Sequence, residues 1–261
     1  MTRRRSLFIL ALAMPALVTL TPPVADGAPA RPRAAKTTFT YAEIADGFFK
    51  VAFGAEYRLA GPSDRIRKFT TPVRVAVDGD KNPRRRATLE NVVATIGARI
   101  AHLDIAIATR GEAANFTVTL VRDRDMRRII AQRLGKEHAR AIRRRLDPQC
   151  LSGFRRNEQF AIERAEVILA VDTDDFTFRD CAYEEMLQAL GPINDTDTVP
   201  WTMFNDAVRT GAFGVYDQLL LNILYDPRIR PGMSADEVKA LLPQVLPDVR
   251  AFVGTNNKPR R

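Results

Sequence analysis

The spacing of apolar residues predicts a chain in which helices and strands mix along the sequence. Apolar side chains recur at three- and four-residue steps in five segments, which predicts helices over 41–53, 87–103, 122–146, 179–190 and 216–225. Alternating or continuous apolar runs predict strands over 73–77, 104–109, 115–121 and 165–171. Ser234 and Glu237 form the capping box of a last helix that ends near Leu242. This mixture indicates the α+β fold class, with a mixed sheet packed against helices.

The composition fits one soluble globular domain. With 46% hydrophobic and 27% charged residues, the chain is near the average for soluble proteins, which excludes disordered, collagen-like and polytopic membrane classes. Its length after removal of a leader lies within the range of a single domain. We predict a flexible linker at 31–40, one domain at 41–245 and a basic polar tail at 246–261.

The first thirty residues have the features of a signal peptide. Arg3, Arg4 and Arg5 precede an apolar run from Leu7 to Leu20, and small residues follow at 28 and 30. The apolar run is shorter than the ~20 residues that a spanning helix needs. We therefore expect cleavage of residues 1–30 and a periplasmic or secreted protein with no membrane span.

The cysteine count predicts a disulfide. Cys150 and Cys181 are the two cysteines of the chain, and in an oxidising compartment such a pair usually forms a bridge. A catalytic cysteine is the alternative, but neither His102 nor His138 lies in a recognisable nucleophile motif.

The chain is basic, with 40 lysines and arginines against 31 acids. Much of the excess lies between residues 122 and 164, and it includes Arg127, Arg128, Arg143, Arg144 and Arg145. This segment is either a module that binds anionic envelope polymers or lipid headgroups, or a solvated helix face with its arginines in ion pairs. Nucleic acid is not an expected partner outside the cytoplasm.

The segment CAYEEMLQALGPIND carries the motif with the clearest chemical meaning. Its polar residues fall in the register of H-E-x-x-H-x-x-G-x-x-H, the zinc motif of metzincins. Glu184, Gln188 and Asn194 stand at the three histidine positions. Glu185 stands at the glutamate and Gly191 at the glycine. Every histidine of the motif is replaced.

The replaced ligands argue against a zinc site. One carboxylate and two carboxamides occupy the ligand positions, whereas catalytic zinc is held mainly by imidazole, carboxylate and thiolate groups. Amide oxygens are hard neutral donors that suit calcium or magnesium better, and a single negative charge makes a weak site even for those ions. We expect no metal and no other cofactor.

Several stretches along the chain resemble the exported proteobacterial domain-of-unknown-function family 2927. The matching stretches are FFKVAFGAEY at 48–57, PVRVAV at 72–77, ANFTVTLV at 114–121, CAYEEMLQALGPIND at 181–195, MFND at 203–206, and Asp217 with LLLNILYDPRIRPGM at 219–233. Members of that family look like relatives of the zincin metallopeptidases. The resemblance implies a single zincin-like domain with a degenerate active-site helix. Met203 would then stand either in a methionine turn or simply in the core.

Three functions are compatible with these features. In the first, a non-catalytic zincin-like protein of the cell envelope binds a peptide, a glycan or another envelope component in a pocket. The candidate pocket residues are Glu184, Glu185, Gln188, Asn194 and Asp195. In the second, a hydrolase uses Glu185 as its general base without histidine-bound zinc, although the sequence names no group that would polarise the substrate carbonyl. In the third, the basic segment binds anionic surfaces.

Overall fold

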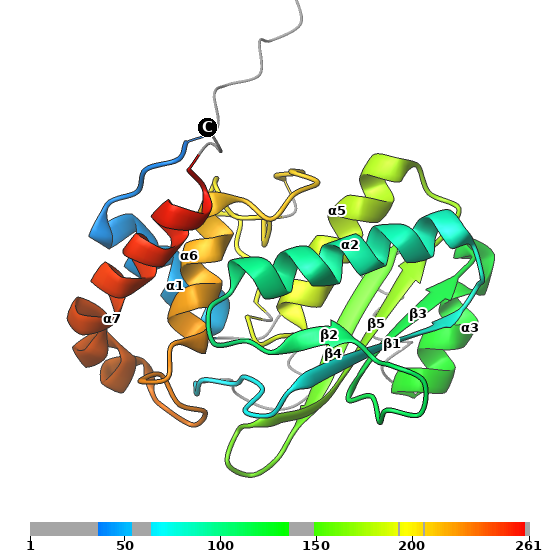
Figure 1. The fold of residues 1–261 in the computed structure, drawn as a ribbon, viewed down its shortest axis with the longest axis horizontal. Coiled ribbons are helices and arrows are strands. Elements are labelled where there is room, and N and C mark those ends of the chain that lie inside the picture. The colour runs from blue at the N-terminus through cyan, green and yellow to red at the C-terminus, as the bar shows by residue number, and fades with distance from the viewer. Residues whose placement is uncertain (1–35, 54–63, 136–148, 193, 206, 259–261) are drawn as a thin grey trace, which may run out of the picture. The chain divides into compact units, whose positions relative to one another are not determined.

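The computed structural model describes residues 36–53, 64–135, 149–192, 194–205 and 207–258. These residues form a mixed sheet packed with helices, which confirms the α+β class (Figure 1). None of the helices in these ranges is long and apolar enough to cross a membrane. The predicted signal peptide lies outside these residues, as do His138 and Arg143 to Arg145.

Five strands form the sheet in the order β2-β1-β3-β5-β4. Their bounds are β1 Val73–Gly79, β2 Ile105–Ile107, β3 Phe116–Val121, β4 Cys150–Arg156 and β5 Ile162–Ala170. Strands β2, β1, β3 and β5 run parallel, and β4 lies antiparallel to β5. The apolar pattern predicted four of these strands and missed β4. Its sequence CLSGFRR shows no clean alternation, and only pairing with β5 makes it a strand.

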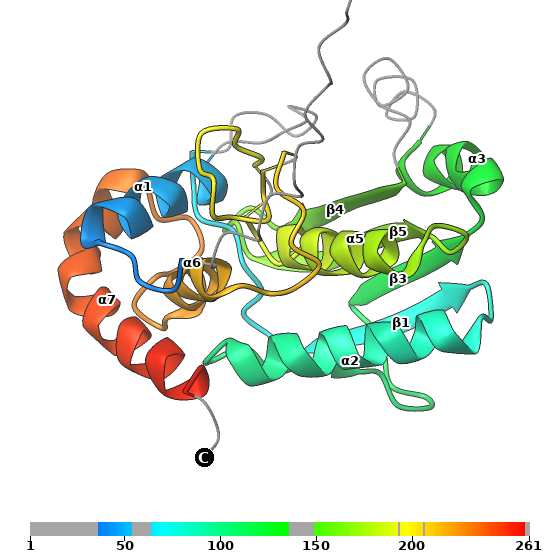
Figure 2. The same cartoon turned by 90° about the horizontal axis from the view of Figure 1, so that it is seen from above.

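Helices cover both faces of the sheet. Helices α2 (Pro83–Arg99) and α5 (Asp175–Gln188) lie on one face, and α3 (Asp123–Leu134) lies on the other (Figure 2). Alternate residues of β5 point to opposite faces of the sheet and pack against the helices on each face. Val167 belongs to the large core shared with α2 and α5, whereas Ile168 packs with Met126 of α3. This two-sided burial explains the unbroken apolar run from Val167 to Ala170 at the end of β5.

Three further helices gather beside the sheet, at the left in Figure 1. They are α1 (Tyr41–Ala52), α6 (Val215–Tyr225) and α7 (Ala235–Asn256). Helix α1 is held against α6 because the hydroxyl of Tyr216 donates to the carbonyl oxygen of Glu43 at 2.5 Å. A Cβ at Gly47 would lie 2.0 Å from that hydroxyl, so this contact requires glycine.

The last helix is longer than the sequence predicted. The predicted capping box of Ser234 and Glu237 is confirmed, but α7 continues through Pro243 and Pro247 to Asn256. Proline inside a helix removes a backbone donor and usually ends the helix. Here Val245, Leu246, Val249 and Val253 are buried at helical spacing, and their packing outweighs that cost. Residues 246–256 therefore belong to α7 rather than to a tail.

The segment LYDPRIRPGM joins α6 to α7 through charged side chains. Lys68 is buried, and its Nζ donates to the carbonyl oxygens of Leu224 and Asp226 at 2.9 and 3.0 Å. Burial lowers the pKa of Lys68 to about 8. Arg228 bridges Asp226 at 2.7 Å and Asp248 of α7 at 2.8 Å. The segment is thus part of the scaffold.

Candidate functional site

Helix α5 is fixed at its start and along its length. Asp174 caps it by accepting from the backbone N–H groups of Phe176 and Thr177 at 2.9 and 3.0 Å. The predicted disulfide is confirmed, because Cys150 of β4 is bonded to Cys181 of α5. The edge strand β4 is therefore covalently tied to the helix that carries the motif.

Gln188 is the motif residue with the best-defined partners. It is 4% exposed, and its Nε2 donates to Oδ1 of Asp195 at 2.6 Å. Its Oε1 accepts from the hydroxyl of Ser152 on β4 at 3.3 Å. The side-chain amide therefore joins the helix to the edge strand on one side and to the following loop on the other.

Gly191 allows the chain to turn back toward Gln188. Its φ is 141°, and a Cβ there would lie 2.3 Å from the carbonyl oxygen of Arg67. Only glycine fits this combination of backbone angle and close approach. The turn brings Asp195 within hydrogen-bond distance of Gln188. Helix α5 itself ends at Gln188, shortly before the predicted end at residue 190.

Asn194, at the third histidine position, bonds to a different partner from Gln188. The Nδ2 of Asn194 donates to the carbonyl oxygen of Lys50 at 2.7 Å, which ties the loop to the end of α1. Glu184 is half-buried on α5, and Glu185 is 8% exposed. The structure thus unites Gln188 with Asp195 and directs Asn194 to α1.

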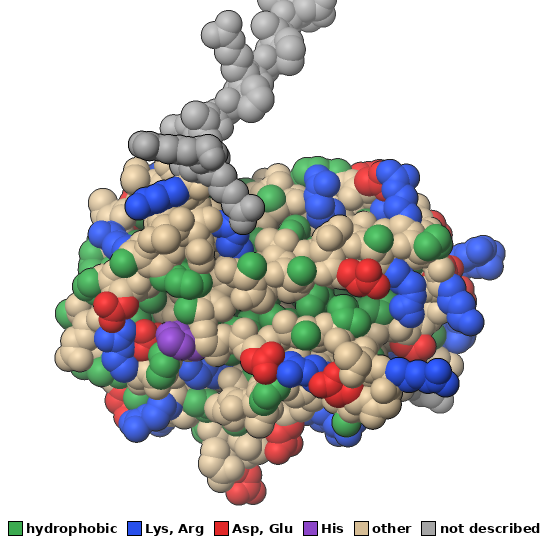
Figure 3. Space-filling model, in the orientation of Figure 1, with side chains coloured by type: hydrophobic (Ala, Val, Ile, Leu, Met, Phe, Trp, Pro, Cys, Tyr) green, Lys and Arg blue, Asp and Glu red, His purple; other side chains and the backbone are tan. Residues whose placement is uncertain are grey.

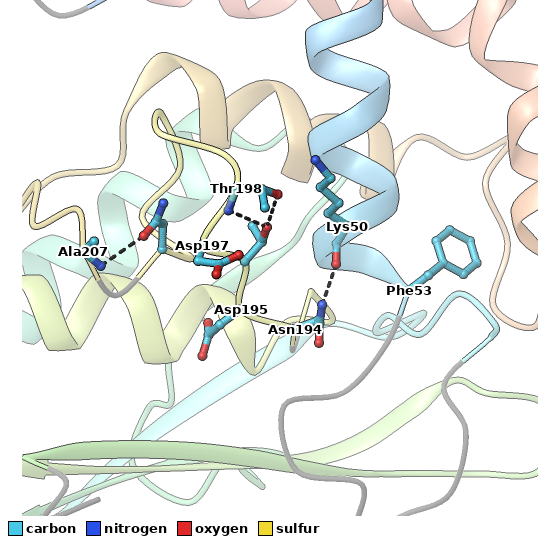
Figure 4. Close-up of a pocket in the computed structure, with 9 residues that line it drawn as sticks. Lys50, Phe53, Asn194, Asp195, Asp197, Thr198 and Ala207 are labelled. Carbon is cyan, nitrogen blue, oxygen red and sulfur yellow. Dashed lines mark hydrogen bonds between the residues drawn. The ribbon is translucent and has the colours of Figure 1, made fainter. Parts of the chain in front are cut away.

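A pocket of about 610 Å³ opens between the end of α1 and the loop after α5 (Figure 4). The residues that line it are Lys50, Phe53, Asn194, Asp195, Thr196, Asp197, Thr198, Asn205 and Ala207. Two of the five predicted pocket residues, Asn194 and Asp195, line this pocket. Glu184, Glu185 and Gln188 lie on the helix behind it and are not among the lining residues.

Most of the pocket lining could not be found from the sequence. Lys50 lies in α1 and Phe53 directly follows it, roughly 140 residues before the loop, and only tertiary packing brings them there. The local signals in the sequence were Asn194 and Asp195 of the motif segment and the polar stretch that follows them, from Thr196 to Thr198. Lys50 forms an ion pair with Asp46 at 2.7 Å, so its charge is already matched.

The donor set does not fit the zinc that the motif register implies. At two of the three histidine positions the side-chain amides are committed, Gln188 to Ser152 and Asp195, and Asn194 to a backbone carbonyl. In the part of the chain that the structure describes, no three His, Cys, Asp or Glu residues come together as a metal site. His102 is exposed in the turn after α2 and does not line the pocket.

A buried carboxylate holds the middle of the loop. Asp217, in the first turn of α6, is 1% exposed and accepts from the hydroxyl of Thr202 at 2.6 Å and from the N–H of Met203 at 3.2 Å. Burial raises the pKa of Asp217 to about 7. Met203 itself is 2% exposed and belongs to the core.

A second carboxylate holds the end of the loop. Asp180 of α5 accepts from the N–H groups of Thr210 and Gly211 at 3.1 and 2.6 Å, and from Nε of Arg209 at 3.3 Å. Together with Asp217, it anchors the loop at two points. The pocket wall is therefore built on fixed backbone, as a preformed binding site requires.

Acidic side chains lie among the basic ones on the described surface (Figure 3). Arg128 of α3 forms an ion pair with Asp125 at 3.0 Å. Figure 3 shows basic and acidic side chains interspersed on the face that it presents. Surface pairs of this kind contribute little stability and reduce the net positive field.

Comparison with known proteins assigns the chain to a family. The model of the family described as "Protein of unknown function (DUF2927)" matches residues 41–244. No curated protein and no solved structure matches the chain. The match covers most of the sequence and includes the sheet, the motif helix and the pocket. The chain belongs to the family of proteins of unknown function DUF2927.

Proposed function

We propose that this protein is a non-catalytic binding protein of the cell envelope, built on a zincin-like scaffold, and that its ligand occupies the pocket beside α5. The hydrogen bond between Gln188 and Asp195 is the observation that carries this proposal. Gln188 stands at the position of a metal ligand in the metzincin motif. Here its hydrogen bond to Asp195 holds the loop that forms the pocket wall. The retained glycine turn and the lost imidazoles both agree with a site that binds without metal chemistry.

The lining of the pocket favours a ligand rich in hydrogen-bond donors. Asp195 and Asp197 supply carboxylate acceptors, and Asn205 supplies a carboxamide. Phe53, directly after α1, adds an apolar residue to the lining. N–H and O–H groups of a peptide or a glycan match this combination. Export through the predicted leader would place the protein beside such ligands, and the disulfide agrees with an oxidising compartment.

The position of Glu185 gives less support to a hydrolase. A general base must come within about 3 Å of the proton that it removes, directly or through one water. Glu185 is 8% exposed and does not line the pocket. The described pocket residues also include no arginine that would polarise a carbonyl.

Titration of the mature protein with defined probes tests the proposal. Trp201 is the single tryptophan and lies in the loop that lines the pocket, so its fluorescence reports on binding. The probes are an N-acetylglucosamine tetrasaccharide and a synthetic tetralysine peptide. Replacing either Asp195 or Asp197 with asparagine is expected to weaken binding about tenfold, because one charge-assisted hydrogen bond is lost. A metal chelator is expected to leave the affinity unchanged.

Asp236→Asn on α7 is the matched control, since it removes an exposed carboxylate outside the pocket. Its affinity is expected to equal that of the wild type. Failure of both probes to bind, or equal affinity in all variants, would refute the proposed pocket. Binding that disappears with the chelator would refute the metal-free site.

A further inference from the structure

The β4–β5 hairpin places two arginines directly opposite each other. Arg155 of β4 and Arg164 of β5 are cross-strand partners in the antiparallel register, and both side chains are exposed. The Cβ atoms of such partners lie about 5 Å apart, and like charges at this distance destabilise a strand pair. The hairpin therefore keeps a locally unfavourable pair of charges.

Neither of these guanidinium groups is neutralised in the described structure. No carboxylate in the described ranges forms an ion pair with Arg155 or Arg164, and neither side chain donates a hydrogen bond there. Two other arginines of the described structure do have partners. Arg156 stacks on the ring of Phe160 at 4.1 Å, and Arg133 forms an ion pair with an aspartate of β1 at 3.0 Å.

The sheet beside the pair has room at one position and a buried carboxylate oxygen, that of Glu166, at another. Arg164 projects from the same face of β5 as Ile168, the face on which α3 packs. Gly153, two residues before Arg155, shares that face, and a Cβ there would meet nothing within 4 Å. Glu166 is opposite Gly153 but forms no ion pair with either arginine in the described residues. The two arginines thus have no ion-pair partner in the described residues, and Gly153 leaves space beside them.

We propose that Arg155 and Arg164 form a phosphate-binding site, separate from the pocket beside α5. A guanidinium group presents a planar fork of N–H donors that matches an oxyanion. A carboxylate has two oxygens, and one fork satisfies both. A terminal phosphate has three oxygens and can accept from two forks at once. The bound phosphate pairs with both guanidinium groups, and its source is either a lipid headgroup or a soluble phosphate compound.

Two binding assays on the mature protein test this site and distinguish the two sources. Calorimetric titration with inorganic pyrophosphate measures soluble phosphate. Co-sedimentation with phosphatidylcholine vesicles, with and without phosphatidic acid, measures binding to a lipid headgroup that carries a terminal phosphate. Arg155→Gln and Arg164→Gln are each expected to weaken binding about tenfold. The double variant is expected to abolish binding. Arg128→Gln removes one charge from an existing ion pair and serves as the control with unchanged affinity.

Thermal unfolding provides a second readout that a purely structural role would not move. Without phosphate, the single variants are expected to melt at or above the wild-type temperature, because the repulsion is relieved. Pyrophosphate is expected to raise the melting temperature of the wild type but not of the double variant. Arginine-dependent binding to vesicles alone identifies a lipid headgroup, and binding to pyrophosphate alone identifies a soluble ligand. No binding to either, or an equal loss in Arg128→Gln, overturns the proposal.

Discussion

Replacing Asp217 with alanine is expected to lower the free energy of unfolding by about 3 to 5 kcal/mol. The substitution leaves the hydroxyl of Thr202 and the N–H of Met203 without their acceptor in a buried site, and it also creates a cavity. Urea unfolding at pH 7 measures the loss. Asp217→Asn is the matched control, because its side-chain oxygen can still accept from Thr202. Its loss is expected to be less than half as large.

The burial of Asp217 should also make the free energy of unfolding depend on pH. The pKa of Asp217 is about 7 in the folded protein against an ordinary value of 3.8, so the folded state holds the proton more tightly than the unfolded state. The contribution of this group is therefore fully present below about pH 4 and is lost as the pH rises through 7, by at most about 4 kcal/mol.

Comparison with Asp217→Asn isolates this effect from that of other titrating groups. The difference in stability between wild type and Asp217→Asn is expected to change between pH 4 and 7 and to stay level above pH 8. A difference that is flat across the whole range would show that burial does not perturb the carboxyl group of Asp217, and would contradict its role as a buried anchor of the loop.

Loss of the disulfide should have the second large effect. Cys150 and Cys181 are 31 residues apart, and closing a loop of that length stabilises a fold by about 4 kcal/mol in the chain-entropy model. The double variant Cys150→Ala/Cys181→Ala is expected to lose about that amount in urea unfolding. It should also loosen β4 from α5, and with it the contact between Ser152 and Gln188.

Reduction of the wild-type protein provides the control for this prediction. A thiol reductant should destabilise the wild type as much as the double variant, and it should have no effect on the double variant itself. Equal stability of the oxidised wild type and the double variant would contradict the prediction.

The parts of the fold that the sequence predicted are those with strong local signals. Helix α1 and strand β3 have clear apolar periodicity and strong burial, and the structure has both. The bridge between Cys150 and Cys181 followed from the even cysteine count. The glycine stop at residue 191 followed from its place after the last apolar residue of the helix.

The parts that the sequence could not predict depend on contacts between distant segments. Strand β4 has no pattern of its own and is defined by its ladder with β5. Helix α7 continues past Pro243 because its buried face continues. The pocket joins Phe53, directly after α1, to a loop far along the chain, and no spacing rule connects them. Among the motif residues, spacing placed Gln188 on the helix but could not show that its partner is Asp195.

Zinc competition on the mature protein tests the central claim most directly, namely that the hydrogen bond between Gln188 and Asp195 takes the place of metal ligation. The protein is purified without chelator, loaded with zinc and titrated with a chromophoric chelator. We expect the chelator to remove all zinc at once, both from the wild type and from Gln188→Ala. One zinc per chain that resists the chelator in the wild type and is lost in Gln188→Ala would contradict the claim.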